Sequence, residues 1–104
     1  MRQRGWTVLA LVLAAAAPVA HAQDKDALYV KGLAATCAAC HGTGGKAADG
    51  SSVPGLAGMD RATMAASLRA FKAGSRPATV MHQLAKGYSD AQIDQLAGYF
   101  AAQK

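Results

Sequence analysis

Two cysteines and a histidine fall within five consecutive residues of this chain, in the segment Cys37-Ala38-Ala39-Cys40-His41. They are the only two cysteines among its 104 residues. A chain of this length forms one domain, and so small a domain usually needs a disulfide, a metal or a large cofactor to fold stably. The Cys-x-x-Cys-His segment is therefore the feature that most restricts what the chain can fold around.

A Cys-x-x-Cys pair has several common chemistries. A zinc site needs four ligands, or three and a water, but the chain from residue 23 onward supplies only His82 besides His41. A redox dithiol of the thioredoxin type belongs in a βαβ setting, and no strand pattern surrounds this pair. Covalent attachment of haem c fits best, because a histidine directly follows the second cysteine. We interpret Cys37 and Cys40 as the thioether residues of one haem and His41 as an iron ligand.

The N-terminal segment has the charged, apolar, small-residue order of a secretory signal peptide. Two arginines precede an apolar run over residues 6–17, and Ala-His-Ala at residues 20–22 surrounds a cleavage point. The run is shorter than the ~20 residues that span a bilayer as a helix, and a retained membrane anchor is the alternative. We expect a signal peptide over residues 1–22 and a periplasmic domain over residues 23–104, with no membrane span after cleavage.

The charge pattern argues against two broad classes of function. Part of the net charge of +5 belongs to the signal peptide, and no basic run of the kind that binds nucleic acid remains. All six acidic residues are aspartates, mostly at expected helix starts, where capping explains them. The chain offers no nucleophile–base pair and no paired carboxylates. We expect neither a nucleic-acid partner nor an enzyme.

Apolar spacing predicts three main helices and no strand, which makes the chain all-α. The helices are expected from about residue 27 to near residue 37, over residues 60–74 and over residues 89–100. The first two begin at aspartates, and Ser89 with Gln92 forms a capping box at the start of the third. A glycine-rich loop over residues 42–58 and a second loop from residue 75 to about residue 88 separate them. Loops this long in a small domain commonly wrap a ligand.

The second axial ligand has four candidates, which are Met59, Met64, Met81 and His82. Met64 lies on the apolar face of a helix, where methionine is ordinary core filler. Met59 is so near His41 in the chain that reaching the opposite haem face is awkward. Met81 and His82 lie in the second loop, where neighbours in an extended segment point opposite ways. Position favours Met81, with His82 as the runner-up.

Three parts of the chain together resemble the class I cytochrome c family. They are residues 37–42, the Val-Pro-Gly-Leu-Ala-Gly stretch at residues 53–58, and Met81 with the final helix. The resemblance covers essentially all of the mature chain. It implies His41 as the proximal ligand and Met81 as the sulfur ligand. It also implies that the carbonyl of Pro54 steadies the proximal imidazole.

The resemblance implies a fold as well. It implies a small class I cytochrome c, in which three main helices and long loops surround one covalent haem. The first and last helices are expected to cross at right angles near Gly32 and Tyr99. Residues 71–81 and 85–90 are similar to the cytochrome subunit of flavocytochrome c sulfide dehydrogenase and to the halves of dihaem bacterial cytochromes. The single haem motif departs from the dihaem pattern.

One-electron transfer is the role that fits a haem iron with both axial positions filled, because no open site remains for substrate. Methionine ligation raises the reduction potential relative to two histidines. We expect the electron-accepting cytochrome subunit of a flavin-containing sulfide dehydrogenase. The alternative is a free soluble periplasmic shuttle between respiratory complexes. A permanent subunit presents a large apolar patch, whereas a shuttle presents charge for weak, fast docking.

The expected docking surface is the segment Arg76–Tyr88 together with the nearby thioether edge of the haem. Small residues such as Ala78 and Gly87 allow a tight fit there, and Lys86 sets the orientation. The charged side chains of Lys46, Lys72, Arg76 and Lys86 allow docking of either kind, and a solvated surface is the alternative explanation for the lysines.

Overall fold

The computed structural model describes residues 25–104, and every regular element among them is helical. The all-α prediction is therefore confirmed for this part of the chain. A first helix covers residues 25–35. After it come α2 (Ala38–His41), the 3-10 turn η1 (Thr43–Gly45), α3 (Arg61–Ala73), α4 (Met81–Lys86) and α5 (Asp90–Ala101). The signal peptide expected over residues 1–22 lies outside the described residues.

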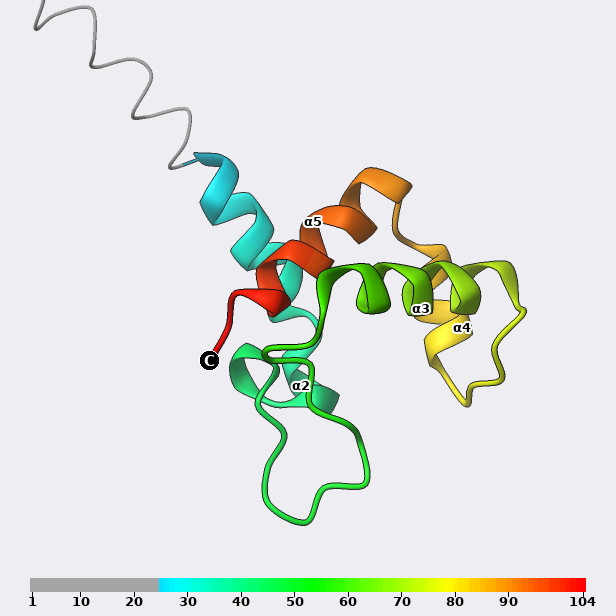
Figure 1. The fold of residues 1–104 in the computed structure, drawn as a ribbon, viewed down its shortest axis with the longest axis horizontal. Helices are drawn as coiled ribbons and strands as arrows, with labels where there is room; N and C mark the ends of the chain where they lie inside the picture. The colour runs from blue at the N-terminus through cyan, green and yellow to red at the C-terminus, as the bar shows by residue number, and fades with distance from the viewer. Residues whose placement is uncertain (1–24) are drawn as a thin grey trace, which may run out of the picture.

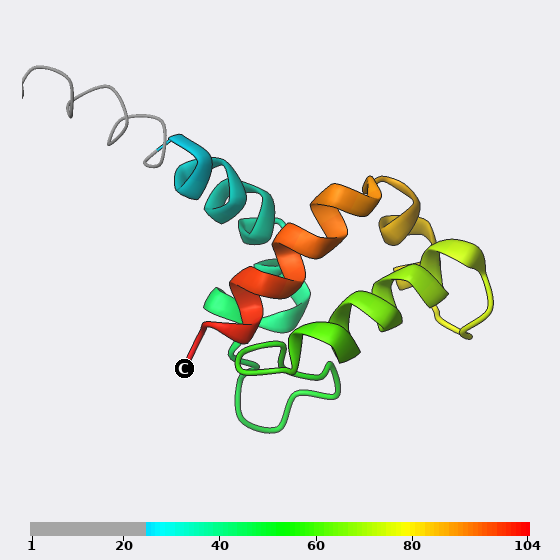
Figure 2. The same cartoon turned by 45° about the horizontal axis from the view of Figure 1, so that its top comes forward.

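Helices α3 and α5 lie side by side and run in opposite directions, and α4 packs against α3 (Figure 1). The first helix runs across α5 rather than alongside it (Figure 2). The glycine-rich loop that follows η1 extends from the end of the molecule where α3 begins and α5 ends. None of the helices in the described residues is long and apolar enough to cross a membrane.

Local capping signals explain where the two longest helices begin. The Asp60 carboxylate accepts a hydrogen bond from the Thr63 N–H at 2.9 Å, which satisfies a free donor at the start of α3. The Ser89 hydroxyl accepts from the Gln92 N–H at 3.1 Å, and the Gln92 side chain accepts from the Ser89 N–H at 2.9 Å. The predicted capping box is therefore present. Helix α3 ends at Gly74, which has left-handed backbone angles.

Helix α4 corrects the expected second loop, because Met81 begins a helix there instead of lying in an extended segment. Its sequence, Met-His-Gln-Leu-Ala-Lys, is rich in good helix formers. One of its residues, Ala85, is fully buried and packs the helix against the rest of the protein. Gly74 and Pro77 interrupt helical structure only in the residues before α4. Since consecutive helical residues are about 100° apart, Met81 and His82 do not point in opposite directions.

The expected role of Gly32 at a helix crossing is wrong. Gly32 is exposed, and a Cβ placed on it would have no heavy atom within 4 Å outside its own helix and neighbours. The first helix enters the core through Ala34 instead, which is 3% exposed. An alanine methyl group is small enough for this contact. Tyr99 does pack against the core, and its ring is edge-on to that of Phe100, with centroids 5.2 Å apart.

The hydrophobic core lies where the first helix, α3 and α5 meet. Its largest fully buried side chains are Ile93, Leu96 and Phe100, all on α5. Partly buried residues from elsewhere in the chain also pack against the same cluster, among them Cys37, Met59, Met81 and Tyr88. The cysteine segment and the start of α4 therefore pack against the same hydrophobic core.

Candidate functional site

The cysteine segment forms one helical turn. The His41 N–H donates to the Cys37 carbonyl at 2.9 Å, and the Gly42 N–H donates to the Ala38 carbonyl at 3.0 Å. No disulfide joins the two cysteines, and Cys37 is partly buried whereas Cys40 is exposed. Because the two residues are three apart on a turn of 3.6 residues, their side chains leave the backbone on neighbouring faces.

The environment of Cys37 combines an apolar support with two hydroxyl groups. Burial raises the pKa of its thiol, because a thiolate is poorly solvated there. Hydrogen bonding to the hydroxyls of Thr36 and Tyr88 lowers the same pKa, as a smaller effect. The sulfur therefore sits at the edge of the core with polar groups beside it.

The His41 ring is held by a short hydrogen bond. Its Nδ1 lies 2.6 Å from the Pro54 carbonyl oxygen. A carbonyl can only accept, so Nδ1 carries the proton and the lone pair is on Nε2. This arrangement orients the imidazole and leaves Nε2 able to bind a metal, as the outer partners of metal-binding histidines commonly do.

The loop that carries Pro54 is itself fixed by backbone hydrogen bonds. The Gly45 carbonyl accepts from the N–H groups of Leu56 and Ala57, at 2.7 and 3.0 Å. Leu56 is buried in the core. The glycine-rich loop is thus pinned directly after Pro54, which holds its carbonyl against His41.

The other candidate ligands differ in their surroundings. Met64 is only 4% exposed and lies inside the core. Met59 and Met81 are partly buried and pack on the outside of that core. The Nδ1 of His82 is buried and has no hydrogen-bond partner.

One hydrogen-bonded group beside the cysteine segment contains Thr36, Tyr88 and Lys72. Among them, only Tyr88 and Lys72 were expected to be functional, as parts of the docking surface. The Tyr88 hydroxyl is 3.2 Å from the Thr36 hydroxyl, and the Lys72 Nζ donates to the Tyr88 carbonyl at 2.5 Å. Lys72 was expected as a docking charge but is engaged within the fold. Only one local feature of the sequence could have pointed to Tyr88. It is a large aromatic residue between Gly87 and the helix cap Ser89, in a short segment that is otherwise small and polar.

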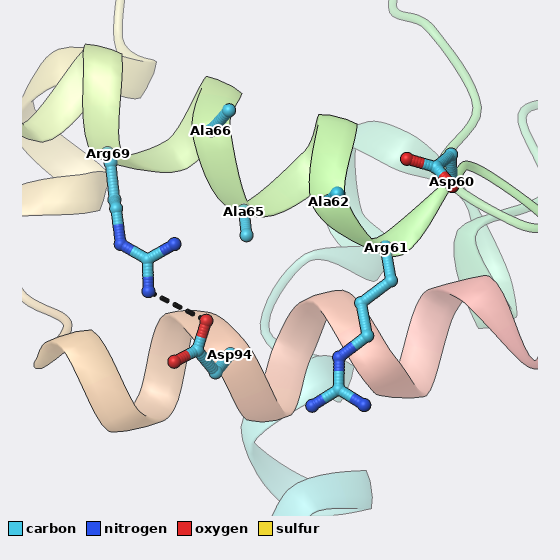
Figure 3. Close-up of a pocket in the computed structure, with 7 residues that line it drawn as sticks. All are labelled: Asp60, Arg61, Ala62, Ala65, Ala66, Arg69 and Asp94. Atoms are coloured by element: carbon cyan, nitrogen blue, oxygen red, sulfur yellow. Dashed lines mark hydrogen bonds and ion pairs between the residues drawn. The ribbon is translucent and has the colours of Figure 1, made fainter.

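A shallow groove between α3 and α5 contains none of these residues. Figure 3 shows its alanine floor on α3 and the Arg69–Asp94 ion pair across it, which is 2.7 Å long. Arg61 reaches from α3 towards α5, where its guanidinium lies above Gly98. The groove is part of the packing between two helices, and it is separate from the cysteine turn and α4.

The donor set matches a covalently held haem. Two cysteines that share one helical turn without a disulfide suit two thioether bonds, and an imidazole with Nδ1 protonated offers Nε2 to iron. A methionine thioether lies against the core that also supports Cys37. The described residues contain no group of three or more His, Cys, Asp or Glu side chains that could hold a metal ion by themselves. A protein-bound zinc site has therefore no support in this part of the chain.

Comparison with known proteins places this chain beside c-type cytochromes. A family model described as cytochrome c oxidase, cbb3-type, subunit III matches residues 20–100. The thiosulfate dehydrogenase electron acceptor of Thiomonas intermedia is 42% identical over 71 residues, which are 68% of this chain and 33% of that protein. The cytochrome subunit of sulfide dehydrogenase of Chlorobaculum tepidum is 41% identical over 68 residues, 65% of this chain and 60% of that protein.

A shorter relative is matched over most of its length. Cytochrome c-554(548) of Halomonas halodenitrificans is 35% identical over 72 residues, which are 66% of this chain and 86% of that protein. By contrast, the aligned part of this chain spans about a third of the Thiomonas protein and three fifths of the Chlorobaculum protein.

Proposed function

Because this chain belongs to the c-type cytochrome family described as cytochrome c oxidase, cbb3-type, subunit III, we propose that it is a one-electron carrier in the periplasm. Its single haem c is attached in this proposal to Cys37 and Cys40 and ligated by His41 and Met81. The observation that carries the proposal is the 2.6 Å contact between His41 Nδ1 and the Pro54 carbonyl. This contact leaves Nε2 of His41 free to bind iron.

Bound haem c supplies a one-electron iron couple. The chain's own residues do the rest of the work. Cys37 and Cys40 anchor the group, and the Pro54 carbonyl keeps the proton of His41 on Nδ1 and so keeps its ring oriented. Met81 completes the ligand set with a sulfur atom, which raises the reduction potential relative to a second histidine. Ligation by both His41 and Met81 would leave no position at the iron for a substrate, so the chemistry supplied there would be electron transfer.

One observation favours Met81 over His82 as the second ligand. Met81 packs against the same core as Cys37, which is the expected point of haem attachment.

Substitution of these two neighbours tests the ligand assignment. The ferric protein is expected to show the weak far-red charge-transfer band of thioether-ligated haem. Met81→Ala should abolish this band and lower the potential by roughly 0.1–0.3 V, within the ~0.8 V range that axial ligands control. His82→Ala should leave both unchanged. If His82→Ala instead opens the iron to carbon monoxide and Met81→Ala does not, the histidine is the ligand.

Haem attachment and export are tested on the same purified protein. The mature chain is expected to begin at Gln23, and its intact mass should include one haem. Haem staining should survive a denaturing gel. A mass equal to that of the chain with two free thiols, or haem that extracts into acidified acetone, would refute covalent attachment.

The proposed partner is a flavin-containing sulfide dehydrogenase, for which this chain is the electron-accepting subunit. Support comes from a relative that is a cytochrome subunit of sulfide dehydrogenase and another that is a thiosulfate dehydrogenase electron acceptor. Two large apolar side chains are more than half exposed one turn apart at α4, Val80 at 54% and Leu84 at 52%. Such neighbouring apolar exposure suits a protein interface.

The docking surface in this proposal is centred on Val80 and Leu84. Arg76 contributes little to it, because its guanidinium stacks on the Phe71 ring at 4.7 Å and donates to the Ser67 hydroxyl at 2.8 Å. Ala78 lies at the border and is only partly exposed.

Leu84→Glu tests this surface with Leu28→Glu as its control. Both leucines are exposed, Leu28 at 70% and on the first helix. Leu84→Glu should weaken the complex by about 1–3 kcal/mol, because it buries an unpaired charge, while Leu28→Glu should not. The measurement is sulfide-driven reduction with the flavoprotein, against reduction by a small chemical donor. The free shuttle is the better assignment if no stable complex forms and the rate falls steeply with salt for several unrelated partners.

A further inference from the structure

Tyr88 contacts three separate parts of the fold, although it lies in the short connection between α4 and α5. Its hydroxyl is 3.2 Å from the hydroxyl of Thr36, the residue directly before Cys37 and 52 positions earlier in the chain. Its carbonyl accepts a 2.5 Å hydrogen bond from Lys72 on α3. Its side chain packs, partly buried, against the core. One residue therefore connects the cysteine segment, α3 and the end of α4.

The direction of the hydroxyl contact follows from the available protons. The Thr36 hydroxyl donates to the Leu33 carbonyl at 2.8 Å. A carbonyl can only accept, so the single Thr36 proton is committed to that bond. The Tyr88 phenol must therefore donate to the Thr36 oxygen. Neither group has an alternative arrangement that keeps both hydrogen bonds.

We propose that Tyr88 is a positioning residue for the iron centre. Its phenol, held by Thr36, ties the segment that carries Met81 to the point where Cys37 attaches the haem. Met81 begins α4, and Tyr88 follows its end, so fixing Tyr88 fixes where α4 lies relative to the cysteine turn. This inference rests on the proposed thioether bond at Cys37 and the proposed ligation by Met81.

The structural consequence concerns how readily Met81 leaves the iron. Met81 itself is anchored by its partial packing on the core and by the placement of α4. Without the phenol hydrogen bond, α4 can move away from the cysteine turn more easily. The methionine then competes less well against any other ligand, even though the haem stays covalently attached.

Added imidazole is the probe for this competition, and Tyr88→Phe is the variant. The variant keeps the ring and its packing but removes the hydrogen bond to Thr36. The affinity of the ferric holoprotein for imidazole, followed through loss of the charge-transfer band, should rise about two- to tenfold, the factor that one hydrogen bond contributes to an equilibrium. Thr36→Val should raise the imidazole affinity similarly. Thr36→Ser keeps the hydroxyl group and should therefore have the imidazole affinity of the unmodified protein. The double variant should show no further rise, because both changes break the same bond.

Tyr29→Phe is the matched control. Tyr29 accepts a 2.9 Å hydrogen bond from Gln92 between the first helix and α5, so this variant also removes one long-range phenol contact. It should leave imidazole affinity unchanged. If Tyr29→Phe and Tyr88→Phe bind imidazole equally well and the unmodified protein shows the band, the positioning role of Tyr88 is overturned. The proposed ligation by Met81 then still stands. Absence of the band from the unmodified ferric protein overturns the proposed Met81 ligation, and the role of Tyr88 with it.

Discussion

Gly45 occupies a position that a residue with a side chain can enter only with strain. Its φ is +77°, and a Cβ there would lie 2.8 Å from Cδ1 of Phe100 and 2.9 Å from the Ala57 nitrogen. Its carbonyl accepts the two hydrogen bonds that fix the loop after Pro54. The loop can therefore approach α5 this closely only because residue 45 is a glycine, which has a hydrogen atom where alanine has a methyl group.

Gly45→Ala is expected to destabilise the holoprotein by about 2–5 kcal/mol, the sum of left-handed backbone strain and overpacking. Gly44→Ala is the control, because Gly44 has a φ of +64° but its Cβ would meet no atom within 4 Å. That variant should lose only about 1–2 kcal/mol, from strain alone. Urea unfolding measures both. Equal losses would show that the contact with Phe100 carries no energy.

Asp60 makes the stability of α3 depend on pH. Hydrogen bonds from the backbone and side chain of Thr63 hold the pKa of its carboxyl below the usual 3.8. A lowered pKa in the folded state means that the contribution is fully present above the unfolded pKa and disappears as pH falls through the folded pKa. Compared with Asp60→Asn, the unmodified protein should be more stable near neutral pH, and the difference should vanish in acid. A difference in unfolding midpoint that persists unchanged into strong acid would contradict this cause.

At the scale of a helix, the start of α5 joins a local signal to a long-range contact. Gln92 accepts from Ser89 in the capping box and donates through Nε2 to the Tyr29 hydroxyl on the first helix. The box was predictable from four consecutive residues. The contact to Tyr29, 63 positions away, follows only from how the helices cross.

Ser89→Ala should lower the free energy of unfolding by about 1 kcal/mol, because it leaves an N–H at the start of α5 without a partner. Gln95→Ala, at an exposed position of the same helix, should change it by less than about 0.5 kcal/mol. Thermal unfolding followed by circular dichroism compares the two. Similar small effects for both variants would mean that water replaces the cap without loss.

Across elements, helix α4 shows why a loop prediction can be wrong. The breakers that suggested a loop, Gly74 and Pro77, act only on the residues around them. The six residues of α4 gain their helical form from packing against α3, with Ala85 fully buried. Short helices are rarely stable alone, so their presence depends on tertiary contacts.

On the scale of the whole molecule, the described core is small. Ten apolar residues are buried, and four of them are alanines, Ala34, Ala65, Ala85 and Ala97. Domains of this size gain only a few kcal/mol from such a core. The covalent haem is thus expected to be part of what keeps the chain folded.

Removing both proposed attachment residues tests this dependence. Cys37→Ser combined with Cys40→Ser should yield a chain that no longer stains for haem and that unfolds without a cooperative transition in urea. Helical circular dichroism and the sharpness of the transition are the measurements. A cooperative transition near that of the holoprotein would show that the protein core suffices.

The sequence by itself determined the all-α class and the starts of α3 and α5, and it predicts Cys37 and Cys40 as the attachment residues. Each of these depends on residues within about four positions of one another, as in the Cys-x-x-Cys-His turn or the Ser89–Gln92 box. The tertiary structure alone decided that Ala34 rather than Gly32 enters the core, and that the Tyr88 hydroxyl meets Thr36. Such contacts join residues far apart in the chain. Their geometry is fixed by how packed helices cross, which no local pattern encodes.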